Sequence, residues 1–130
     1  MIETCMLLDG VELPYPPSVN HYWEPCVYKK RGKTIRGRRK SEKALQFIAA
    51  MKLLARRKNA VIGRVGVLLT VFFPDRRVRD LDNLLKGVLD GLVAAGVMLD
   101  DSQIHDLRVV NSGEIVTGGK IVVSVWEILE

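Results

Sequence analysis

The chain has 130 residues and a formal net charge of +5, and 48% of its residues are hydrophobic. This is the size of one domain with enough apolar side chains to bury a core, so we expect a single domain over residues 1–130. No apolar run reaches the length of a membrane span, no charged-then-apolar leader is found, and Cys5 and Cys26 lack metal-ligand spacing. We therefore expect a reduced, cytoplasmic protein with no membrane partner.

The positive charge is concentrated in one stretch of the chain. Residues 29–40 carry eight basic side chains, whereas the remainder has 12 basic and 15 acidic residues and a charge of −3. Such a concentration indicates a phosphate-rich partner. No apolar period passes through the stretch and two glycines interrupt it, so we expect a mobile basic loop at about residues 24–40. A solvated loop without a partner is the alternative, but further basic clusters at 52–58 and 76–79 favour nucleic acid.

The N-terminal segment is predicted to be extended. Apolar stretches at 5–8 and 11–15 flank Asp9-Gly10, which forms either a tight hairpin or a bulge in one strand. Prolines then hold the chain extended, and residues 18–23 follow as a loop rich in aromatic and amide groups.

Periodicity predicts a first helix and three further strands. Ser41 can cap the helix, which ends near Arg57. Its predicted buried stripe consists of Ala44, Leu45, Ile48, Met51, Leu54 and Ala55. Apolar side chains alternate along residues 65–73, which therefore form a strand, and two more strands are expected at 104–110 and 121–128.

A second helix follows the strand at 65–73 and begins with acidic residues. Its apolar side chains recur at helical spacing before Gly96 and are Leu81, Leu84, Leu85, Val88, Leu89, Leu92 and Val93. If Asp80 is the N-cap, its backbone is extended, so its carboxylate can converge with that of Asp82. Lys86 lies roughly 6 Å further along the helix and can reach a phosphate there, whereas Asp90, roughly 12 Å along, is too far to share an ion with Asp82.

The element order β-α-β-α-β-β predicts an α+β fold of two layers, with a mixed β-sheet and two helices on one face. In this layout Asp80 and Asp82 follow the end of one strand, and Asp100-Asp101 precede the next. We expect these carboxylates to meet at one edge of the sheet.

Each acidic residue also has an ordinary structural explanation. Asp80 can be a simple helix cap, and Asp82 with Lys86 can be an i, i+4 ion pair. The second acidic pair and the neighbouring arginines favour a metal site instead. Carboxylates without histidine or cysteine partners are typical ligands of Mg²⁺, for which Mn²⁺ would substitute.

Three ordered motifs resemble one known family. LPYPPSVN at 13–20, PDRRVRDLDNLLK at 74–86 and LDDSQI at 99–104 together are similar to the RusA family of Holliday junction resolvases, small endonucleases of mostly phage or prophage origin. The resemblance spans nearly the whole chain. It implies a homodimeric, Mg²⁺-dependent endonuclease that cleaves branched DNA, especially four-way junctions, in recombination and repair. Residues 24–40 depart from the resemblance, as a longer basic stretch than in compact members of the family, so no DNA contact of the family transfers to them.

The resemblance places the catalytic residues at Asp80, Asp82, Lys86 and Asp101, with Asp80, Asp82 and Asp101 as metal ligands. Adjacent residues of an extended segment point to opposite sides, so Asp100 is expected to support Asp101 rather than bind the ion. The side chains expected to contact DNA are Lys29, Lys30, Arg31, Arg38, Arg39, Arg76, Arg77, Arg79 and Asn20.

Two other functions are compatible with the same residues. One is a DNA-binding architectural module whose carboxylates are only caps; it would bind junctions without metal and would not cleave them. The other is a nuclease for a different substrate, such as RNA or flap structures. An enzyme whose substrate is not a nucleic acid is a weaker alternative. The sequence contains no nucleophile with an adjacent base and no glycine-rich phosphate loop.

Overall fold

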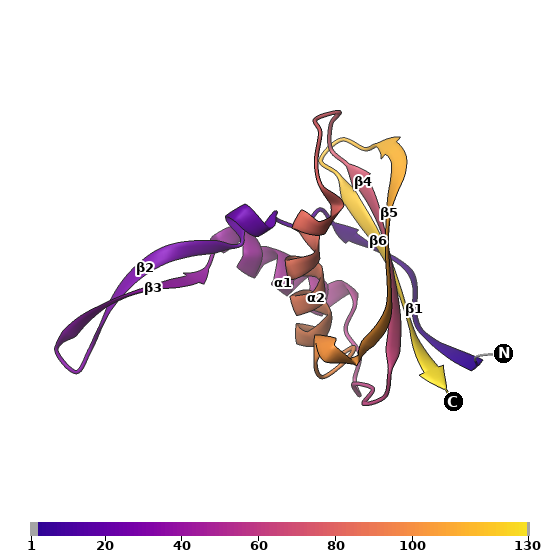
Figure 1. Ribbon diagram of the computed structural model, residues 1–130, viewed down its shortest axis with the longest axis horizontal. Helices are drawn as coiled ribbons and strands as arrows, with labels where there is room; N and C mark the ends of the chain where they lie inside the picture. Colours follow the sequence, from indigo (N-terminus) through magenta and orange to yellow (C-terminus); the bar gives the residue numbers. More distant parts are fainter. Residues whose placement is uncertain (1–2, 130) are drawn as a thin grey trace.

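The computed structural model describes residues 3–129, and its body is a mixed four-stranded sheet with both helices on one face (Figure 1). The sheet contains β1 (Glu3–Pro14), β4 (Val65–Phe73), β5 (Ile104–Ile115) and β6 (Lys120–Leu129) in the order β1-β6-β4-β5. Strand β6 is antiparallel to both neighbours, whereas β4 and β5 are parallel. The helices are α1 (Glu42–Leu54) and α2 (Leu85–Ala94), and the short 3₁₀ turns are η1 (Val19–His21), η2 (Leu81–Leu84) and η3 (Asp101–Gln103). The predicted α+β class is confirmed.

The core lies between this sheet and the helices because side chains alternate along each strand. Every second residue of β4 is buried, and Val67 and Leu69 are fully buried, as is Val123 on the neighbouring β6. The helices cover these residues with side chains such as Val88 and Leu92 of α2. Among residues 3–129, no helix is long and apolar enough to cross a bilayer.

The two helices pack unusually close to each other at one glycine. A Cβ placed on Gly91 of α2 would lie 2.7 Å from Cγ of Met51, a fully buried side chain of α1. Only glycine allows this approach without movement of the methionine.

The Asp9-Gly10 alternative is resolved as a bulge. Strand β1 continues through both residues, and its register against β6 shifts between Leu8 and Val11. Gly10 has a φ of +60°, and its N–H donates to Oγ of Ser124 at 2.9 Å. The left-handed backbone that the bulge needs explains why glycine stands there.

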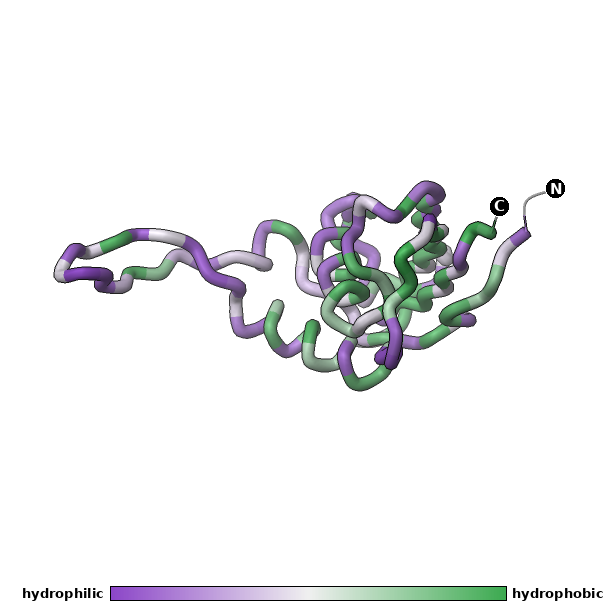
Figure 2. The backbone as a smooth tube through the Cα atoms, turned by 90° about the horizontal axis from the view of Figure 1, so that it is seen from below, coloured by the Kyte–Doolittle hydropathy of each residue, from purple (hydrophilic) through white to green (hydrophobic). Residues whose placement is uncertain are grey.

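The mobile loop predicted at about 24–40 is wrong: this segment is a β-hairpin that projects from the body (Figures 1 and 2). It consists of β2 (Trp23–Lys30) and β3 (Lys33–Lys40), paired in continuous antiparallel register. The two turn residues, Arg31 and Gly32, have φ values of 53° and 76°, as a two-residue hairpin turn requires. The stretch was predicted to be a loop because most of its residues are charged, although it also contains β-branched and aromatic residues that favour strands.

Helix α1 begins as predicted, and four residues of its predicted buried stripe are buried: Ala44, Ile48, Met51 and Ala55. The N–H of Ala44 donates to Oγ of Ser41 at 3.1 Å, which confirms the cap. The helix ends at Leu54 rather than near Arg57. Leu45 and Leu54 are 55% and 51% exposed, and Phe47 is buried instead. The predicted stripe was too wide, because only the face toward the sheet and α2 is covered.

Candidate functional site

Asp80 and Asp82 lie where the chain enters η2. Asp80 has the extended backbone that was predicted (φ −90°, ψ 132°), but its side chain makes no capping hydrogen bond. Asp82 lies in the first turn, and within residues 3–129 neither carboxylate has an ion-pair partner. The i, i+4 pair between Asp82 and Lys86, the alternative explanation for Asp82, is not formed, since Lys86 pairs with Asp90. The two structural explanations for these carboxylates therefore do not apply.

The loop that precedes Asp80 is stabilised by hydrogen bonds between Asp75 and two arginines, Arg77 and Arg79. The guanidinium of Arg79 donates two hydrogen bonds to the carboxylate of Asp75, and the backbone N–H of Arg77 donates a third at 3.0 Å. The Arg79 hydrogen bonds hold the pKa of Asp75 well below its usual range. Arg79 is thus engaged in holding the loop, whereas Arg76 and Arg77 are exposed at its tip.

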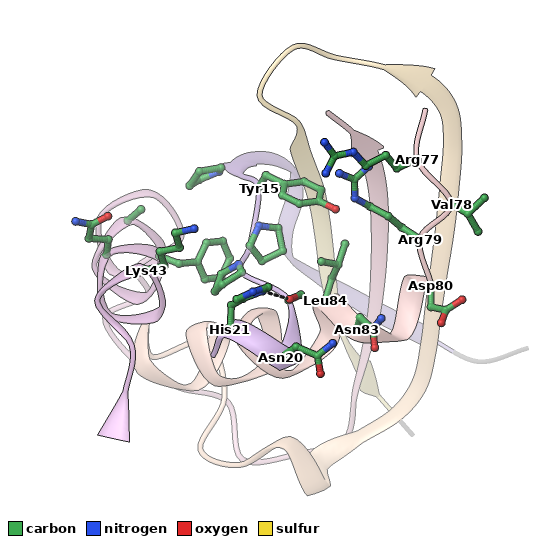
Figure 3. A pocket seen from close by; sticks show the side chains of 17 residues that line it. Tyr15, Asn20, His21, Lys43, Arg77, Val78, Arg79, Asp80, Asn83 and Leu84 are labelled. Carbon is green, nitrogen blue, oxygen red and sulfur yellow. Dashed lines mark hydrogen bonds between the residues drawn. The ribbon is translucent and has the colours of Figure 1, made fainter. Parts of the chain in front are cut away.

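A cavity of about 960 Å³ lies between this loop, the proline-rich segment after β1 and helix α1 (Figure 3). Its lining brings together Asp80, Arg77, Arg79 and Asn20, all residues singled out from the sequence. Asn83, which was not predicted, adds an amide beside Asp80. The walls combine these polar and basic side chains with apolar ones such as Phe47 and Leu84, and the basic part of the wall suits a phosphodiester.

A second pocket of about 440 Å³ contains Lys86, Asp100 and Asp101, together with Asp90 and Lys40. Nζ of Lys86 lies 3.4 Å from Oδ1 of Asp90, so the ammonium group is held beside the carboxylates of the pocket. This pocket therefore joins the predicted lysine to the predicted third carboxylate.

Tyr22 holds Asp90 from the other side. Its hydroxyl donates to Oδ2 of Asp90 at 2.6 Å, and its ring is fully buried against Trp23 with 5.3 Å between centroids. Burial and this hydrogen bond raise the pKa of Tyr22 above its usual value, so the hydroxyl remains a donor. The sequence did not reveal this contact, since 68 residues separate the two partners. Only the i, i+4 spacing of Lys86 and Asp90 was a visible signal.

Asp100 and Asp101 have different roles. The side chain of Asp100 caps η3 by accepting from the backbone of Gln103, whose Oε1 accepts from the Asp100 N–H at 3.0 Å. A hydrogen bond from Ser102 lowers the pKa of Asp100. Asp100 is thus engaged in the turn, whereas Asp101 is exposed at the pocket. This favours Asp101 as the ligand and Asp100 as its support.

The expectation that Asp80, Asp82 and Asp101 meet at one edge of the sheet is wrong for a single chain. Residues 3–129 contain no group of three acidic, histidine or cysteine side chains placed to hold one ion. Because β4 and β5 are parallel, the end of β4 and the start of β5 lie at opposite edges. Asp80 and Asp82 precede α2, Asp101 lies beside its last turn, and the ten residues of α2 span about 15 Å.

The donor set nevertheless fits a hard divalent cation. Asp80 and Asp82 supply exposed carboxylate oxygens, and neither is used by a cap or an ion pair of the described chain. Mg²⁺ is commonly bound by one or two carboxylates and several waters.

The other predicted DNA contacts lie on the hairpin. Lys29, Lys30 and Arg31 are at its tip, and Arg38 and Arg39 are on β3. Their surroundings differ: the guanidinium of Arg38 lies 5.7 Å from the Trp23 ring centroid, whereas Arg39 pairs with Glu24 at 2.9 Å.

Comparison with known proteins gives a consistent result. The family model described as endodeoxyribonuclease RusA matches residues 14–125. The chain is 39% identical over 120 residues to the crossover junction endodeoxyribonuclease rusA of Enterobacteria phage HK97, covering 89% of this chain and 92% of that protein. It is 34% identical over 127 residues to the crossover junction endodeoxyribonuclease RusA of Escherichia coli (strain K12), covering 91% and 93%. The match therefore extends over the cavity, the pocket and both helices, and the chain belongs to the RusA family of endodeoxyribonucleases.

Proposed function

We propose that this chain is a Mg²⁺-dependent endodeoxyribonuclease that resolves four-way DNA junctions by hydrolysing one phosphodiester in each of two opposed strands. The protein would act in the cytoplasm, in DNA recombination and repair. The observation that carries the proposal is the pair of unengaged carboxylates, Asp80 and Asp82, at the start of α2 with Lys86 one turn later. Relatives named as crossover junction endodeoxyribonucleases support it.

The residues have distinct roles in this proposal. Asp80, Asp82 and Asp101 would hold Mg²⁺, or Mn²⁺ in its place. The ion, when bound, would lower the pKa of a coordinated water and neutralise the negative charge on the phosphoryl oxygens. Lys86, with its ammonium group held by Asp90, stabilises the negative charge that develops on the phosphate. Asp100 keeps the turn that carries Asp101 in place.

The basic side chains supply the remaining contacts. Arg76 and Arg77 at the tip of the loop before η2, and the basic residues of the hairpin, would contact the DNA backbone. Asn20 lies in the cavity with Asp80 and would approach the strand near the cleaved bond. Such contacts position a branched substrate by where its phosphates lie.

We further propose that two copies of the chain act together. Because α2 separates Asp101 from Asp80 and Asp82, a site with all three needs Asp80 and Asp82 from one copy and Asp101 from the other. A dimer with two-fold symmetry would present two such sites, matching the near two-fold symmetry of a four-way junction.

The first experiment compares cleavage of an immobile four-way junction, a flap and a linear duplex of matched sequence, with Mg²⁺ and with chelator. We expect paired nicks in the junction alone, only with Mg²⁺. Asp82→Asn should lose the nicks but bind the junction as tightly as the wild type or more tightly, because it removes a charge that repels phosphate. Asp9→Asn, an exposed change in the bulge of β1, is the matched control. Metal-independent binding without nicks would instead establish an architectural module.

The second experiment mixes Asp82→Asn and Asp101→Asn subunits by co-refolding. If sites are shared between copies, a mixed dimer retains one site with all three carboxylates, so nicking should reappear although each variant alone is inactive. An inactive mixture, with wild-type protein active after the same treatment, would contradict the shared site.

A further inference from the structure

The register of the hairpin separates its charges onto two faces. Directly paired residues of antiparallel strands point to the same side, and neighbours along a strand point to opposite sides. One side, which we call the cationic face, carries Lys29, Arg36, Arg38 and Lys40. The other side, the rear face, carries the pairs Glu24 with Arg39, Cys26 with Gly37, Tyr28 with Ile35 and Lys30 with Lys33.

Side-chain contacts agree with this division. Arg38 lies over the ring of Trp23, which is paired with Lys40 on the same face. On the rear face, a Cβ at Gly37 would lie 3.7 Å from the Tyr28 ring and 4.0 Å from Sγ of Cys26. The faces are therefore properties of the folded hairpin and cannot be read from the basic run itself.

The two faces differ in how their charge is compensated. Arg39, on the rear face, is paired with Glu24 at 2.9 Å. The cationic face carries no acidic residue, and within residues 3–129 none of its four basic side chains has an ion-pair partner. Lys30 and Lys33 on the rear face also lack an ion-pair partner among these residues. The cationic face nevertheless has a net charge of +4, whereas the rear face, which includes Glu24, has a net charge of +2.

The cationic face leads away from the candidate catalytic residues. Lys40, at its base, lines the same pocket as Lys86 and Asp101. The eight residues of each strand extend the face outward by about 26 Å, well clear of the body (Figure 1). Basic side chains two residues apart on β3 recur about every 6.6 Å along this length. The face forms a continuous basic track that starts at the pocket.

We propose that the cationic face binds the sugar-phosphate backbone of the DNA arm that leaves the cleavage site, while the rear face does not contact DNA. The inference rests on the proposed nuclease function and deepens it. A two-stranded ribbon is narrow enough to lie along a groove of duplex DNA, where phosphates flank it. The proposal adds Arg36 and Lys40 to the DNA-binding set and removes Lys30 and Arg39 from it.

The test compares two double variants that remove equal charge from opposite faces. Arg36→Ala with Arg38→Ala changes the cationic face, and Lys33→Ala with Arg39→Ala changes the rear face. Binding to a four-way junction is measured with chelator present, by fluorescence anisotropy at several salt concentrations. Thermal melts of both variants check that each is folded. Because each lost phosphate contact reduces the slope of log K against log salt by about 0.9, the first variant should lose about 1.8.

The rear-face variant should keep the wild-type slope. If both variants lose the same amount, only net charge matters and the assignment of faces is overturned. If neither changes the slope, the hairpin does not bind DNA and the inference fails. Cleavage by wild-type protein with Mg²⁺ is measured in parallel, so failure of the nuclease function is seen separately from failure of the hairpin.

Discussion

At the scale of single residues, the most consequential contact is the link from Tyr22 through Asp90 to Lys86. The sequence argument placed Asp90 too far along the helix to share an ion with Asp82. The structure shows that Asp90 instead holds the ammonium group of Lys86 and is held by Tyr22. Asp90 is thus a positioning residue for the proposed site.

The first prediction concerns this position. Asp90→Asn keeps an acceptor for Tyr22 but removes the charge that holds Lys86, so we expect the single-turnover cleavage rate to fall about tenfold or more. Junction binding and the melting temperature should remain close to those of the wild type. Asp106→Asn, which removes an exposed pair with Arg108 on β5, is the control. If Asp90→Asn cleaves at the wild-type single-turnover rate, the ion pair with Asp90 is not required for Lys86 to act in cleavage.

The second prediction concerns pH and Asp75. Because its folded pKa is lowered, Asp75 contributes stability that is present above its ordinary value of 3.8 and is lost as pH falls toward the lower folded value. Urea unfolding should therefore find Asp75→Asn less stable than the wild type at pH 7, with a smaller difference at pH 3. A difference independent of pH would show that folding does not lower the pKa of Asp75.

At the scale of elements, the contact between α1 and α2 depends on glycines that differ in their surroundings. A Cβ at Gly91 would lie 2.7 Å from Met51, whereas one at Gly87 would meet Tyr22 at 3.5 Å and Phe47 at 3.7 Å, ordinary contact distances. Both positions are inside α2, where alanine is intrinsically favoured over glycine by about 1 kcal/mol.

The third prediction follows from this pair. Gly91→Ala should be destabilising, because overpacking costs about 1–3 kcal/mol and exceeds the gain in helix propensity. Gly87→Ala should be neutral or stabilising by up to about 1 kcal/mol. Urea unfolding of the two variants under one condition measures both. Equal effects at the two positions would contradict the close approach at Met51.

At the scale of the whole molecule, the parallel pairing of β4 with β5 decides where the carboxylates lie. A parallel connection must return along the full length of the sheet, and α2 makes that return. Asp80 and Asp82, which follow β4, are therefore separated by a helix from Asp101, which precedes β5, although they are only about twenty positions apart in the chain.

The fourth prediction follows if two copies complete each site. Specific cleavage activity should fall on dilution, in the concentration range where sedimentation shows two-copy particles separating into single chains. Excess Asp82→Asn protein added to dilute wild-type protein should restore nicking in one strand, since mixed pairs keep one complete site. Activity that stays constant while the particles separate would show that one chain is sufficient.

Local pattern allowed some features to be predicted well. Alternation predicted the strand at 65–73 with correct ends, since its inward side chains are buried by both helices. Ser41 and the extended backbone of Asp80 were also predicted, because caps depend on neighbouring residues. The hairpin was missed because its charged side chains face solvent on both sides and leave no apolar period.

The sequence by itself determined the elements of the fold, the chemical nature of the candidate site and, through three ordered motifs, the family. These properties depend on residue types and short spacings, which persist whatever the chain does elsewhere. Only the tertiary structure decided that Asp101 lies at the opposite end of α2 from Asp80 and Asp82, that the Tyr22 hydroxyl binds Asp90, and that one face of the hairpin carries four basic side chains and no acidic one. Strand direction, long-range contacts and cross-strand register set these relations, and none of them is encoded in local sequence periodicity.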